Sequence, residues 1–556
     1  MASKVKTPKY IFVSGGVISG IGKGIAASSI AFLMKSYGYK ITMIKMDPYL
    51  NVDAGTMNPL EHGETFVLED GYETDMDIGH YERFTGELFN EKSSMTAGRV
   101  LKRLLEDERS MEYKGRCVEF DTHVPLEVVK WVEDVQKTNQ SDITVIEIGA
   151  TVGELGQRIY LEANRIMKVW FPNDVIHVHV SYLPIPKNLG EMKSKPVQLS
   201  VQLLNGAGIN PDFIIARSEL PIDDIRREKL SFKCYVPKDN VISAPDIENI
   251  YEVPLNFEKD ELGRKLLEKF GLQAKRNGVF EEWKEKFAKL SDAKEKVTIG
   301  IVGKYYKSGD FDLKDSYVSV IEAIRHAAWA QNLLPEIKWF VADDFENDEA
   351  MLEELKSVDG IIVPQGWGSR GGEGKIKAVQ VARESKIPYL GLCYGMQMAV
   401  IEYARNVAGV SGANSEEIDE KAADPVIHIM EEQKKHIAEG NYGGTIRLGA
   451  WPCKVEKGSL LEEMYKKYSN GLFNELPVVQ ERHRHRYEFN NEYREALSKA
   501  GLKITGTSPD DRLVEAIELD KKDHPFFVAT QYHPELKSQF IMPHPLFMGF
   551  IAAAKK

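Results

Sequence analysis

Short apolar runs recur along the first half of the chain and alternate with segments of helical spacing. Residues 10–14 are apolar and β-branched, a glycine-rich turn follows, and helical spacing resumes over residues 25–36. Strands that are apolar throughout are buried on both faces, which is typical of a parallel sheet with helices on each side. The pattern therefore predicts a doubly wound α/β domain. Further strands are expected at residues 40–46, 143–149, 175–181, 213–217 and 241–243.

The same alternation restarts after a charged connection that carries one apolar stripe. Phe280, Trp283, Phe287 and Leu290 are three or four residues apart, so they fall on one face of a helix. We therefore predict two α/β domains, residues 1–274 and 297–556, joined by a linker helix over residues 275–296. Apolar runs of the second domain lie at residues 297–303, 358–364, 388–393 and 526–530.

Composition and charge fit a globular enzyme with more than one domain. Of the 556 residues, 43% are hydrophobic and 28% are charged, which is enough apolar material for two cores. The net charge of −12 disfavours a general nucleic-acid binder. The sequence shows neither a long apolar run nor a basic-then-apolar leader, so we expect no membrane span and no secretion. Wide spacing of the cysteines disfavours a metal site or disulfide framework and favours a reducing, cytoplasmic setting. They are Cys117, Cys234, Cys393 and Cys453.

The turn after the first strand has the chemistry of a phosphate-binding loop. Its glycines let backbone N–H groups approach phosphate oxygens, and Lys23 stands at the start of the following helix. Five residues rather than four separate Gly16 from Gly22, and Gly24 stands where a Ser or Thr would ligate Mg²⁺. The alternative is a tight strand-to-helix connection without a ligand. If a nucleoside triphosphate binds, its metal ion needs ligands from elsewhere in the chain.

Further groups could complete a nucleotide site, and each has a plainer alternative. Lys45 lies in an apolar strand, either as a phosphate partner or at an edge of the sheet. Asp77 ends an acidic cluster that begins at Glu61, which is either a solvated loop or a source of an Mg²⁺ ligand. Glu147 lies at a strand end, where a carboxylate is costly unless it is paired or bound to metal. Residues 193–198 are either a charged surface loop or a second triphosphate site.

In the second half, an apolar strand ends on Cys393 and turns at once into a helix. Flanking glycines at 391 and 395 indicate the sharp turn that exposes a nucleophile, and a helix N-terminus favours the thiolate. His533 and Glu535 follow another strand and could serve as base and orienting group. The alternative is an inert buried cysteine. We predict a cysteine nucleophile served by this His–Glu pair.

The basic run at residues 481–487 is too short to make a nucleic-acid-binding face on an acidic chain. We interpret it as a structural network or as a site where an arginine binds a carboxylate.

Taken together, these segments resemble the CTP synthase family, in order and over nearly the whole chain. The most specific stretch extends from Lys45 to Phe84. The motifs that carry the resemblance are GGVISGIGKG (15–24), KMDPY (45–49), NVDAGTMNP (51–59), ETDMDIGHYERF (73–84), GLCYGMQ (391–397) and ERHRHRYE (481–488).

The resemblance implies an amidoligase domain of dethiobiotin-synthetase-like fold, joined to a class I glutamine amidotransferase domain. ATP would phosphorylate the 4-oxygen of UTP, and ammonia released from glutamine would displace the phosphate to give CTP. The resemblance also implies Mg²⁺ as cofactor, GTP as activator and CTP as feedback inhibitor. It further implies a homotetramer formed through the first domain, an internal ammonia tunnel and, in some members, filaments.

Carried over by motif, the resemblance assigns residues to five roles. The catalytic residues would be Cys393, His533 and Glu535. ATP would contact Gly20, Ile21, Gly22, Lys23, Gly24, Ile25, Lys45, Asp77, Pro245, Asp246 and Ile247. UTP or CTP would contact Ser19, Glu154, Leu155, Gly156, Lys193, Ser194, Lys195, Pro196, Val197, Gln198 and Lys229. Glutamine would contact Gly366, Tyr394, Gly395, Met396, Gln397, Glu417 and Arg486. Mg²⁺ would be held by Asp77 and Glu147.

A few positions depart from the family's motifs. Gln365 and Trp367 stand in a turn that reads Pro-Gly-Gly-Phe-Gly in the family and supplies a backbone N–H to the oxyanion hole. Unlike glycine, Gln365 does not freely adopt positive φ, which bears on the glutaminase geometry. Gly156 replaces a carboxylate that the family uses toward CTP, which bears on feedback inhibition. Ser194 and Val197 replace threonines.

Two other functions remain open from the sequence. One is a different glutamine-dependent amidoligase of similar fold that acts on a carboxylate. The other is a homologue with reduced catalysis that serves mainly as a filament subunit, which the intact candidate catalytic residues disfavour.

Overall fold

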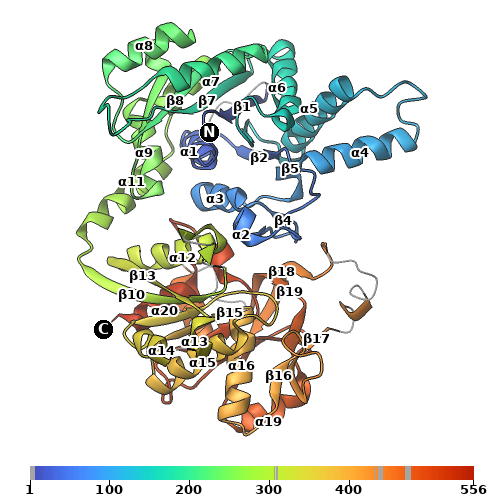
Figure 1. Ribbon diagram of the computed structural model, residues 1–556, viewed down its shortest axis with the longest axis vertical. Coiled ribbons are helices and arrows are strands. Elements are labelled where there is room, and N and C mark those ends of the chain that lie inside the picture. Colours follow the sequence, from blue (N-terminus) through green and yellow to red (C-terminus); the bar gives the residue numbers. More distant parts are fainter. Residues whose placement is uncertain are drawn as a thin grey trace. The chain divides into compact units, whose positions relative to one another are not determined.

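The computed structural model contains two units, each built on its own sheet (Figure 1). It describes residues 7–555 except 306, 309–310, 313, 348, 431–432, 436–442 and 470–476. The first unit comprises Met1–Asp53 and Asp77–Ala288, and the second comprises Ala54–Met76 and Lys289–Lys556.

All strand pairs in the main sheet of the first unit are parallel, in the order β5-β2-β6-β1-β7-β8-β9. The strands are buried almost throughout, which confirms the predicted doubly wound sheet. The bounds are β1 Lys9–Gly15, β2 Ile41–Asp47, β5 Ser94–Thr96, β6 Ile143–Ile148, β7 Val175–Tyr182, β8 Phe213–Ser218 and β9 Val241–Pro245.

Helices cover both faces of this sheet (Figure 1). Apolar side chains of α4 to α7 share one core with strands β1, β2 and β6, while α1 packs against α9, α10 and α11 on the other face. The bounds are α1 Lys23–Ser36, α3 Met76–Thr85, α4 Ala97–Arg109, α5 Phe120–Asn139, α6 Arg158–Trp170, α7 Lys195–Gly206, α8 Asp224–Cys234, α9 Val253–Lys259, α10 Leu262–Lys269 and α11 Val279–Ala288.

The linker helix is shorter than the sequence pattern indicates. Helix α11 ends at Ala288, and a 3₁₀ turn, Lys289–Asp292, follows it. Trp283 is fully buried against Phe32, with ring centroids 4.3 Å apart, and its indole N–H donates to the Tyr251 carbonyl at 2.9 Å. Phe280 and Trp283 are buried, whereas Phe287 is half-buried and Leu290 lies beyond the end of the helix. These contacts make α11 a part of the first unit.

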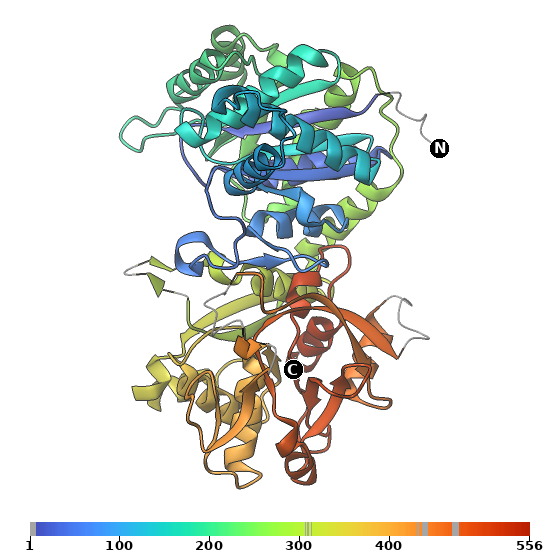
Figure 2. The same ribbon diagram turned by 90° about the vertical axis from the view of Figure 1, so that its right-hand side faces the viewer.

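A mixed sheet forms the centre of the second unit, which is coloured yellow-green to red in Figure 2. Its strand order is β13-β10-β14-β15-β23-β22-β21-β18-β19. The first five strands in this order, β13, β10, β14, β15 and β23, pair in parallel. Each later strand pairs antiparallel with the one before it. The bounds are β10 Glu295–Gly303, β13 Leu333–Val341, β14 Gly360–Val363, β15 Tyr389–Leu392, β18 Arg447–Val455, β19 Val478–His485, β21 Lys503–Thr507, β22 Val514–Glu518 and β23 Phe527–Thr530.

Helices flank the parallel part of this sheet, and a small sheet of β16, β17 and β20 lies beside them. The second α/β domain is thereby confirmed. The bounds are α12 Val318–Trp329, α15 Gly372–Ser385, α16 Tyr394–Asn406, α20 Pro545–Ala554, β16 Ala413–Ser415, β17 Asp424–Ile429 and β20 Tyr487–Phe489.

Residues Ala54–Met76, here called the inserted segment, belong to the second unit although they precede most of the first. The segment contains α2 Pro59–His62, β3 Phe66–Val67 and β4 Glu73–Thr74. Glu69 accepts from the Nε of Arg482 at 2.8 Å, and Glu73 accepts from the Nε of Arg484 at 2.7 Å. Much of the acidic cluster is therefore paired rather than solvated, and the basic run binds carboxylates. The compact units thus differ from the predicted domains, residues 1–274 and 297–556, because the inserted segment belongs to the second unit. The domain boundaries themselves stay a prediction.

Within the part of the chain that the structure describes, the helices all lack the combination of length and hydropathy needed to cross a membrane.

Candidate active sites

The phosphate loop joins β1 to α1 in the first unit and has the backbone shape that its glycines predict. Gly20 and Gly22 have φ of 68° and 89°, a region that glycine adopts without strain. Helix α1 begins at Lys23, whose side chain folds back along Gly15 and is 9% exposed. Burial lowers the pKa of Lys23, and the nearby Glu147 and Asp77 carboxylates oppose that shift.

Asp77 and Glu147 flank the position where the loop lacks a hydroxyl. A Cβ added to Gly24 would lie 2.3 Å from an Asp77 carboxylate oxygen and 3.5 Å from a Glu147 carboxylate oxygen. The ammonium of Lys45 pairs with both groups, at 3.2 Å from Glu147 Oε1. Tyr81 donates its hydroxyl hydrogen to the other Glu147 oxygen. The structure therefore brings the predicted metal ligands together beside Lys23.

This carboxylate pair fits Mg²⁺. The ion takes oxygen ligands, commonly one or two protein carboxylates together with phosphate oxygens and water. Asp77 fills the space next to Gly24 that a side-chain hydroxyl would otherwise use.

Lys45 does not lie at an edge of the sheet, so that alternative is wrong. Strand β2 pairs with β5 on one side and β6 on the other, and Lys45 is opposite Ser94 and Glu147. The lysine is 5% exposed, and a buried lysine requires acidic partners or a ligand.

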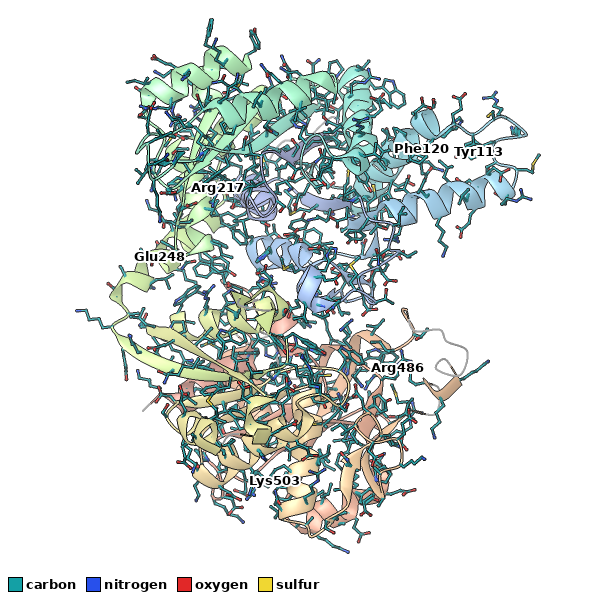
Figure 3. The ribbon with its side chains drawn as sticks, in the orientation of Figure 1. Tyr113, Phe120, Arg217, Glu248, Arg486 and Lys503 are labelled. Carbon is teal, nitrogen blue, oxygen red and sulfur yellow. The ribbon has the colours of Figure 1, made fainter. Side chains whose placement is uncertain are left out.

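A pocket of about 190 Å³ adjoins the phosphate loop at the predicted adenine position. Gly22 lines it from the phosphate loop and Ile25 from α1, and Pro245 and Ile247 line it from the end of β9. Arg217, labelled in Figure 3, also lines the pocket and donates to Asp246 at 2.8 Å. A largely apolar pocket of this kind suits a flat base.

The residues predicted for UTP or CTP fall into separate groups. Leu155 and Gly156 line an open hollow of about 900 Å³, whereas Lys229 lies exposed on α8. Residues 195–198 form the first turn of α7, where Gln198 donates to the Ser194 hydroxyl at 3.0 Å. A Cβ on Gly156 would lie 2.9 Å from the Cβ of Pro48, so close packing accompanies the missing carboxylate. The assignment of all these residues to a UTP or CTP site stays a prediction.

In the second unit, Cys393 occupies a strained turn between β15 and α16. Its φ of 53° and ψ of −100° are rare for a residue with a Cβ, as expected for a nucleophile held at a strand-to-helix elbow. A Cβ on Gly395 would lie 1.9 Å from the Val363 carbonyl oxygen, so only glycine fits there. The sulfur lies 3.7 Å from the Arg484 carbonyl and accepts from Gln531 at 3.6 Å.

His533 and Glu535 stand beside the cysteine in a pre-formed pair. The His533 Nδ1 lies 2.7 Å from Glu535 Oε1, and both side chains are almost fully buried. Burial alone would lower the pKa of His533, but the charges of Glu535 and Cys393 raise it to about 10. An imidazolium beside a thiol favours the thiolate, which is the attacking form.

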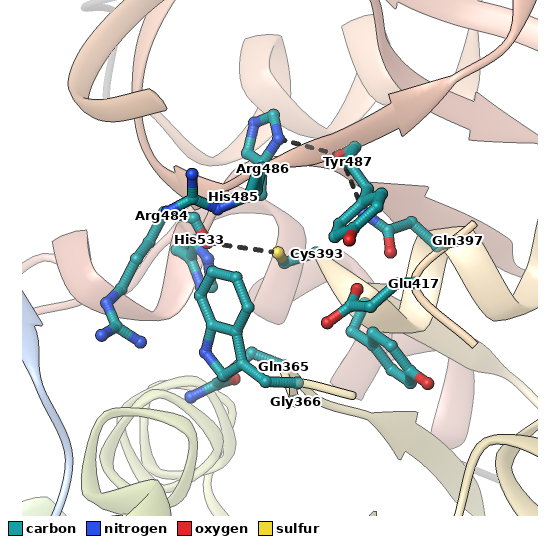
Figure 4. Close-up of a pocket in the computed structure, with 12 residues that line it drawn as sticks. Gln365, Gly366, Cys393, Gln397, Glu417, Arg484, His485, Arg486, Tyr487 and His533 are labelled. Carbon is teal, nitrogen blue, oxygen red and sulfur yellow. Dashed lines mark hydrogen bonds between the residues drawn. The ribbon is translucent and has the colours of Figure 1, made fainter. Parts of the chain in front are cut away.

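The pocket above Cys393 gathers most of the predicted glutamine-binding residues (Figure 4). Glu417 accepts from the Gly368 N–H at 2.7 Å, and burial raises the pKa of its carboxyl. Arg486 donates to Gln433 at 2.9 Å. A carboxylate and a guanidinium in one pocket match the ammonium and carboxylate of an amino acid. The predicted residues that line it are Gly366, Tyr394, Gln397, Glu417 and Arg486.

Gly395 and Met396 are not among the residues that line this pocket, and Met396 is fully buried in the core. Their assignment to glutamine stays a prediction.

The turn after β14 shows how Gln365 fits in place of glycine. Neither Gln365 nor Gly366 has a positive φ. Two buried amines hold the carbonyls of this turn: Lys375 donates to Pro364 at 2.6 Å, and Lys304 donates to Gly368 at 2.7 Å. Burial lowers the pKa of both lysines, that of Lys304 to about 8.

Several pocket residues lay outside the sequence predictions. Arg484, His485 and Tyr487 line the pocket from β19 and the residues after it. Arginine and histidine alternate within the basic run, and successive residues of a strand face opposite sides of the sheet. This alternation was the signal that residues of the run could face a common pocket. Lys304 and Gln531 do not line the pocket but contact the Gly368 carbonyl and the Cys393 sulfur, and no pattern in the sequence indicated these contacts.

Comparisons with known proteins identify the family of each half of the chain. Residues 9–272 match the family described as CTP synthase N-terminus, and residues 312–553 match Glutamine amidotransferase class-I. The CTP synthase of Caldanaerobacter subterraneus subsp. tengcongensis is 47% identical over 546 residues, covering 98% of this chain and 98% of that protein. The CTP synthase of Methanocaldococcus jannaschii is 46% identical over 558 residues, covering 99% of each. This chain belongs to the CTP synthase family.

Membership in the CTP synthase family confirms the resemblance and both domain types. As a family member, the chain is a glutamine-hydrolysing ligase that converts UTP to CTP. A different amidoligase is not favoured, because the family match spans the full chain. A solved structure entitled "Trypanosoma brucei CTPS - glutaminase domain with bound acivicin" is 39% identical, covering 46% of this chain and 93% of that chain, with a TM-score of 0.41.

Proposed function

We propose that the two sites divide CTP synthesis between them. In the first unit, the phosphate loop and Lys23 bind the phosphates of ATP, and Lys45 assists as charge develops on the transferred group. The 4-oxygen of UTP is phosphorylated, which turns a poor leaving group into a good one. Ammonia then displaces phosphate to give CTP. The observation that supports this role is the placement of Asp77 and Glu147 around Gly24.

Mg²⁺ would be held by Asp77 and Glu147, and it would neutralise charge on the ATP phosphates. Lys45 already pairs with both carboxylates. Its ammonium would therefore share these carboxylates with the metal ion.

In the second unit, we propose that the Cys393 thiolate attacks the side-chain amide of glutamine. His533 gives its proton to the departing ammonia, then accepts one from the water that hydrolyses the thioester. Glu535 holds the ring and stabilises its charged form. Glu417 and Arg486 would bind the ammonium and carboxylate groups of glutamine, and the turn at Gly366 would bind the oxyanion.

We also propose the regulation and assembly that the family resemblance implies: activation by GTP, inhibition by CTP, a homotetramer through the first domain and, as in some members of the family, filaments. Leu155 and Phe120, of which Phe120 is labelled in Figure 3, support an assembly surface, because they line the 900 Å³ hollow and are 78% and 61% exposed. The net charge of −12 supports the absence of a nucleic-acid partner. The free thiols of Cys117, Cys234, Cys393 and Cys453 support a cytoplasmic setting.

One assay tests this division of labour. The absorbance change as UTP becomes CTP is followed with ATP and Mg²⁺, using glutamine plus GTP in one sample and ammonium in another. Activity in both supports the whole scheme. Activity with ammonium alone would place a defect in the second unit, and inactivity of the folded protein in both would refute the proposal.

A further inference from the structure

A chain of buried hydrogen bonds lies behind the phosphate loop, and no step proposed above uses it. The chain contains Asn164, His177, Ser14, His179 and Ser200, in that order. Its four bonds measure 3.0, 2.8, 2.9 and 2.7 Å. Ser200 is 3% exposed and the other four side chains are fully buried. A fully buried polar network of this length is costly unless its members are satisfied, so it demands a structural or functional explanation.

These bonds join elements that are far apart in the sequence. Ser14 lies in β1 and is the register partner of His179 in β7. Asn164 belongs to α6, and Ser200 lies in the middle of α7. The chain therefore ties two neighbouring strands to two helices of the same unit (Figure 1).

All four hydrogen bonds of the network can form with both imidazoles neutral, while the buried Asn164 Nδ2 has no hydrogen-bond partner among the residues that the structure describes. Each ring needs only one N–H, provided that all donors point the same way along the chain. Burial lowers the pKa of His179 to about 3 and that of His177 well below its usual value. The network is thus a fixed scaffold at physiological pH and not a titrating switch.

One end of the network touches the phosphate loop directly. A Cβ on Gly16 would lie 1.5 Å from Ser200 Oγ and 3.0 Å from His179 Nε2, so the loop backbone packs on these two groups. The Gly16 N–H donates to the Val180 carbonyl at 3.0 Å. The same helix, α7, carries the proposed UTP-binding residues 195–198 in its first turn.

We propose that His179 and Ser200 are positioning residues that set the distance between the phosphate loop and the first turn of α7. This inference rests on the proposed function, in which these elements hold ATP and UTP. Phosphoryl transfer is governed by alignment of the attacking oxygen with the transferred group, and a misplacement of about 1 Å can cost roughly 100-fold in rate. The network supplies a rigid link between the two substrate-binding elements.

Two variants break the link at the loop end. Ser200→Ala removes the hydroxyl that bonds His179 Nε2. His179→Asn places an amide near the position of the imidazole Nδ1. The amide can keep the hydrogen bond to Ser14, but the side chain is too short to form the one to Ser200. The matched control is Asn164→Leu, which breaks the far end of the same network and leaves the loop contact intact. Ser200→Ala leaves His179 Nε2 unpaired, and Asn164→Leu leaves His177 Nδ1 unpaired, so we expect similar losses of thermal stability in these two variants.

The test measures kcat and KM for ATP and UTP, with ammonium as nitrogen source, together with thermal unfolding. We expect Ser200→Ala and His179→Asn to lower kcat by about 10- to 100-fold with each KM within about threefold. We expect Asn164→Leu to keep kcat within about threefold despite a similar loss of Tm. Equal loss of kcat in all three variants would show a merely structural role and overturn the proposal. Wild-type kcat in Ser200→Ala, or a rise in KM alone, would overturn it as well. Failure of the proposed function itself would appear differently, as no CTP formation by the unaltered protein.

Discussion

At Cys393, backbone conformation and neighbouring charge both prepare one side chain for attack. The positive φ holds the sulfur at the end of β15, and the start of α16 and the raised pKa of His533 place positive charge beside it. Cys453 offers a contrast within the same unit. Burial raises the pKa of that thiol well above its usual value, so it stays protonated and inert. The environment, and not the residue type, separates the nucleophile from the core cysteine.

Substitution of the nucleophile should separate the two nitrogen sources. Cys393→Ala should abolish glutamine-dependent CTP synthesis, because no thioester can form. Ammonium-dependent synthesis should remain within about twofold, since the substitution removes no group of the first unit. Steady-state assays with each nitrogen source check this, and Cys453→Ala is the matched control that should keep both activities. Loss of both activities in a folded Cys393→Ala protein would contradict the division of labour.

The pH dependence of glutamine hydrolysis should report the charge of His533. The pKa of this imidazole is raised, so the proton is present below about pH 10 and is lost as the pH rises through that value. We therefore expect kcat for glutamine hydrolysis to fall on the alkaline side near pH 10, because kcat reports the groups of the enzyme–substrate complex and not the ammonium of free glutamine. Glu535→Gln removes the carboxylate that raises this pKa, so the alkaline limb should move down by about one pH unit or more.

The same variant should lower kcat for glutamine hydrolysis by roughly 100-fold, because the ring loses its orienting partner. Rate measurements between pH 6 and 10.5 test both effects. An unchanged alkaline limb in Glu535→Gln would assign the titration to another group.

At the scale of elements, the turn after β14 shows how backbone geometry accommodates an unusual residue. Gln365 keeps a negative φ, its Nε2 donates to Glu64 at 3.4 Å, and Lys375 holds the neighbouring carbonyls. The turn is therefore fixed by buried amines on its inner side. The conformational freedom of a glycine at this position is not required.

Restoring glycine in this turn should consequently have little effect. Gln365→Gly should leave kcat/KM for glutamine within about threefold and lower stability by about 0.5–1 kcal/mol, through the larger backbone entropy of the unfolded chain. Gln365→Ala, which removes the side chain but keeps the backbone preference, is the control. Glutaminase kinetics and denaturant unfolding measure the two effects. A tenfold gain in kcat/KM for Gln365→Gly, without a gain for Gln365→Ala, would mean that the Gln365 backbone is strained in this turn.

Much of the fold was predictable because buried parallel strands leave a strong sequence pattern. The expected strand at residues 10–14 appears as Lys9–Gly15, and the one at 175–181 appears as Val175–Tyr182. The linker helix was predicted too long, because Leu290 continues the apolar spacing after the helix has ended. Spacing alone does not reveal where helical hydrogen bonding stops.

The candidate sites were predictable where chemistry is local in sequence, and less so where it depends on tertiary contact. The phosphate loop and the Cys393 elbow each lie within one short stretch. Glu69 and Glu73 were grouped with Asp77 as candidate Mg²⁺ ligands or solvated charges, yet both pair with arginines more than 400 residues away. Only the folded chain brings such partners together, so their role could not be derived from spacing.

At the scale of the whole molecule, the inserted segment is the main departure from a linear arrangement of domains. It enters the second unit, pairs Glu69 with the fully buried Arg482, and returns to the first unit at Asp77. The carboxylate of Glu64 accepts from the Ser319 N–H at 3.0 Å near the start of α12. The stability of the second unit should therefore depend on residues that are encoded in the first half of the chain.

A fragment consisting of residues 289–556 should accordingly be folded but destabilised. Without the segment, Arg482 and Arg484 lose their carboxylate partners, and removing one partner of a buried ion pair costs about 3–5 kcal/mol. We expect Tm to fall by roughly 5–15 °C relative to a fusion that carries residues 54–76. A synthetic peptide of residues 54–76 should bind the fragment and restore much of this loss by mass action. A peptide with Glu69→Gln and Glu73→Gln should restore less, because its amides cannot neutralise the two arginines. Equal Tm values for fragment and fusion would show that the segment adds no stability to the second unit.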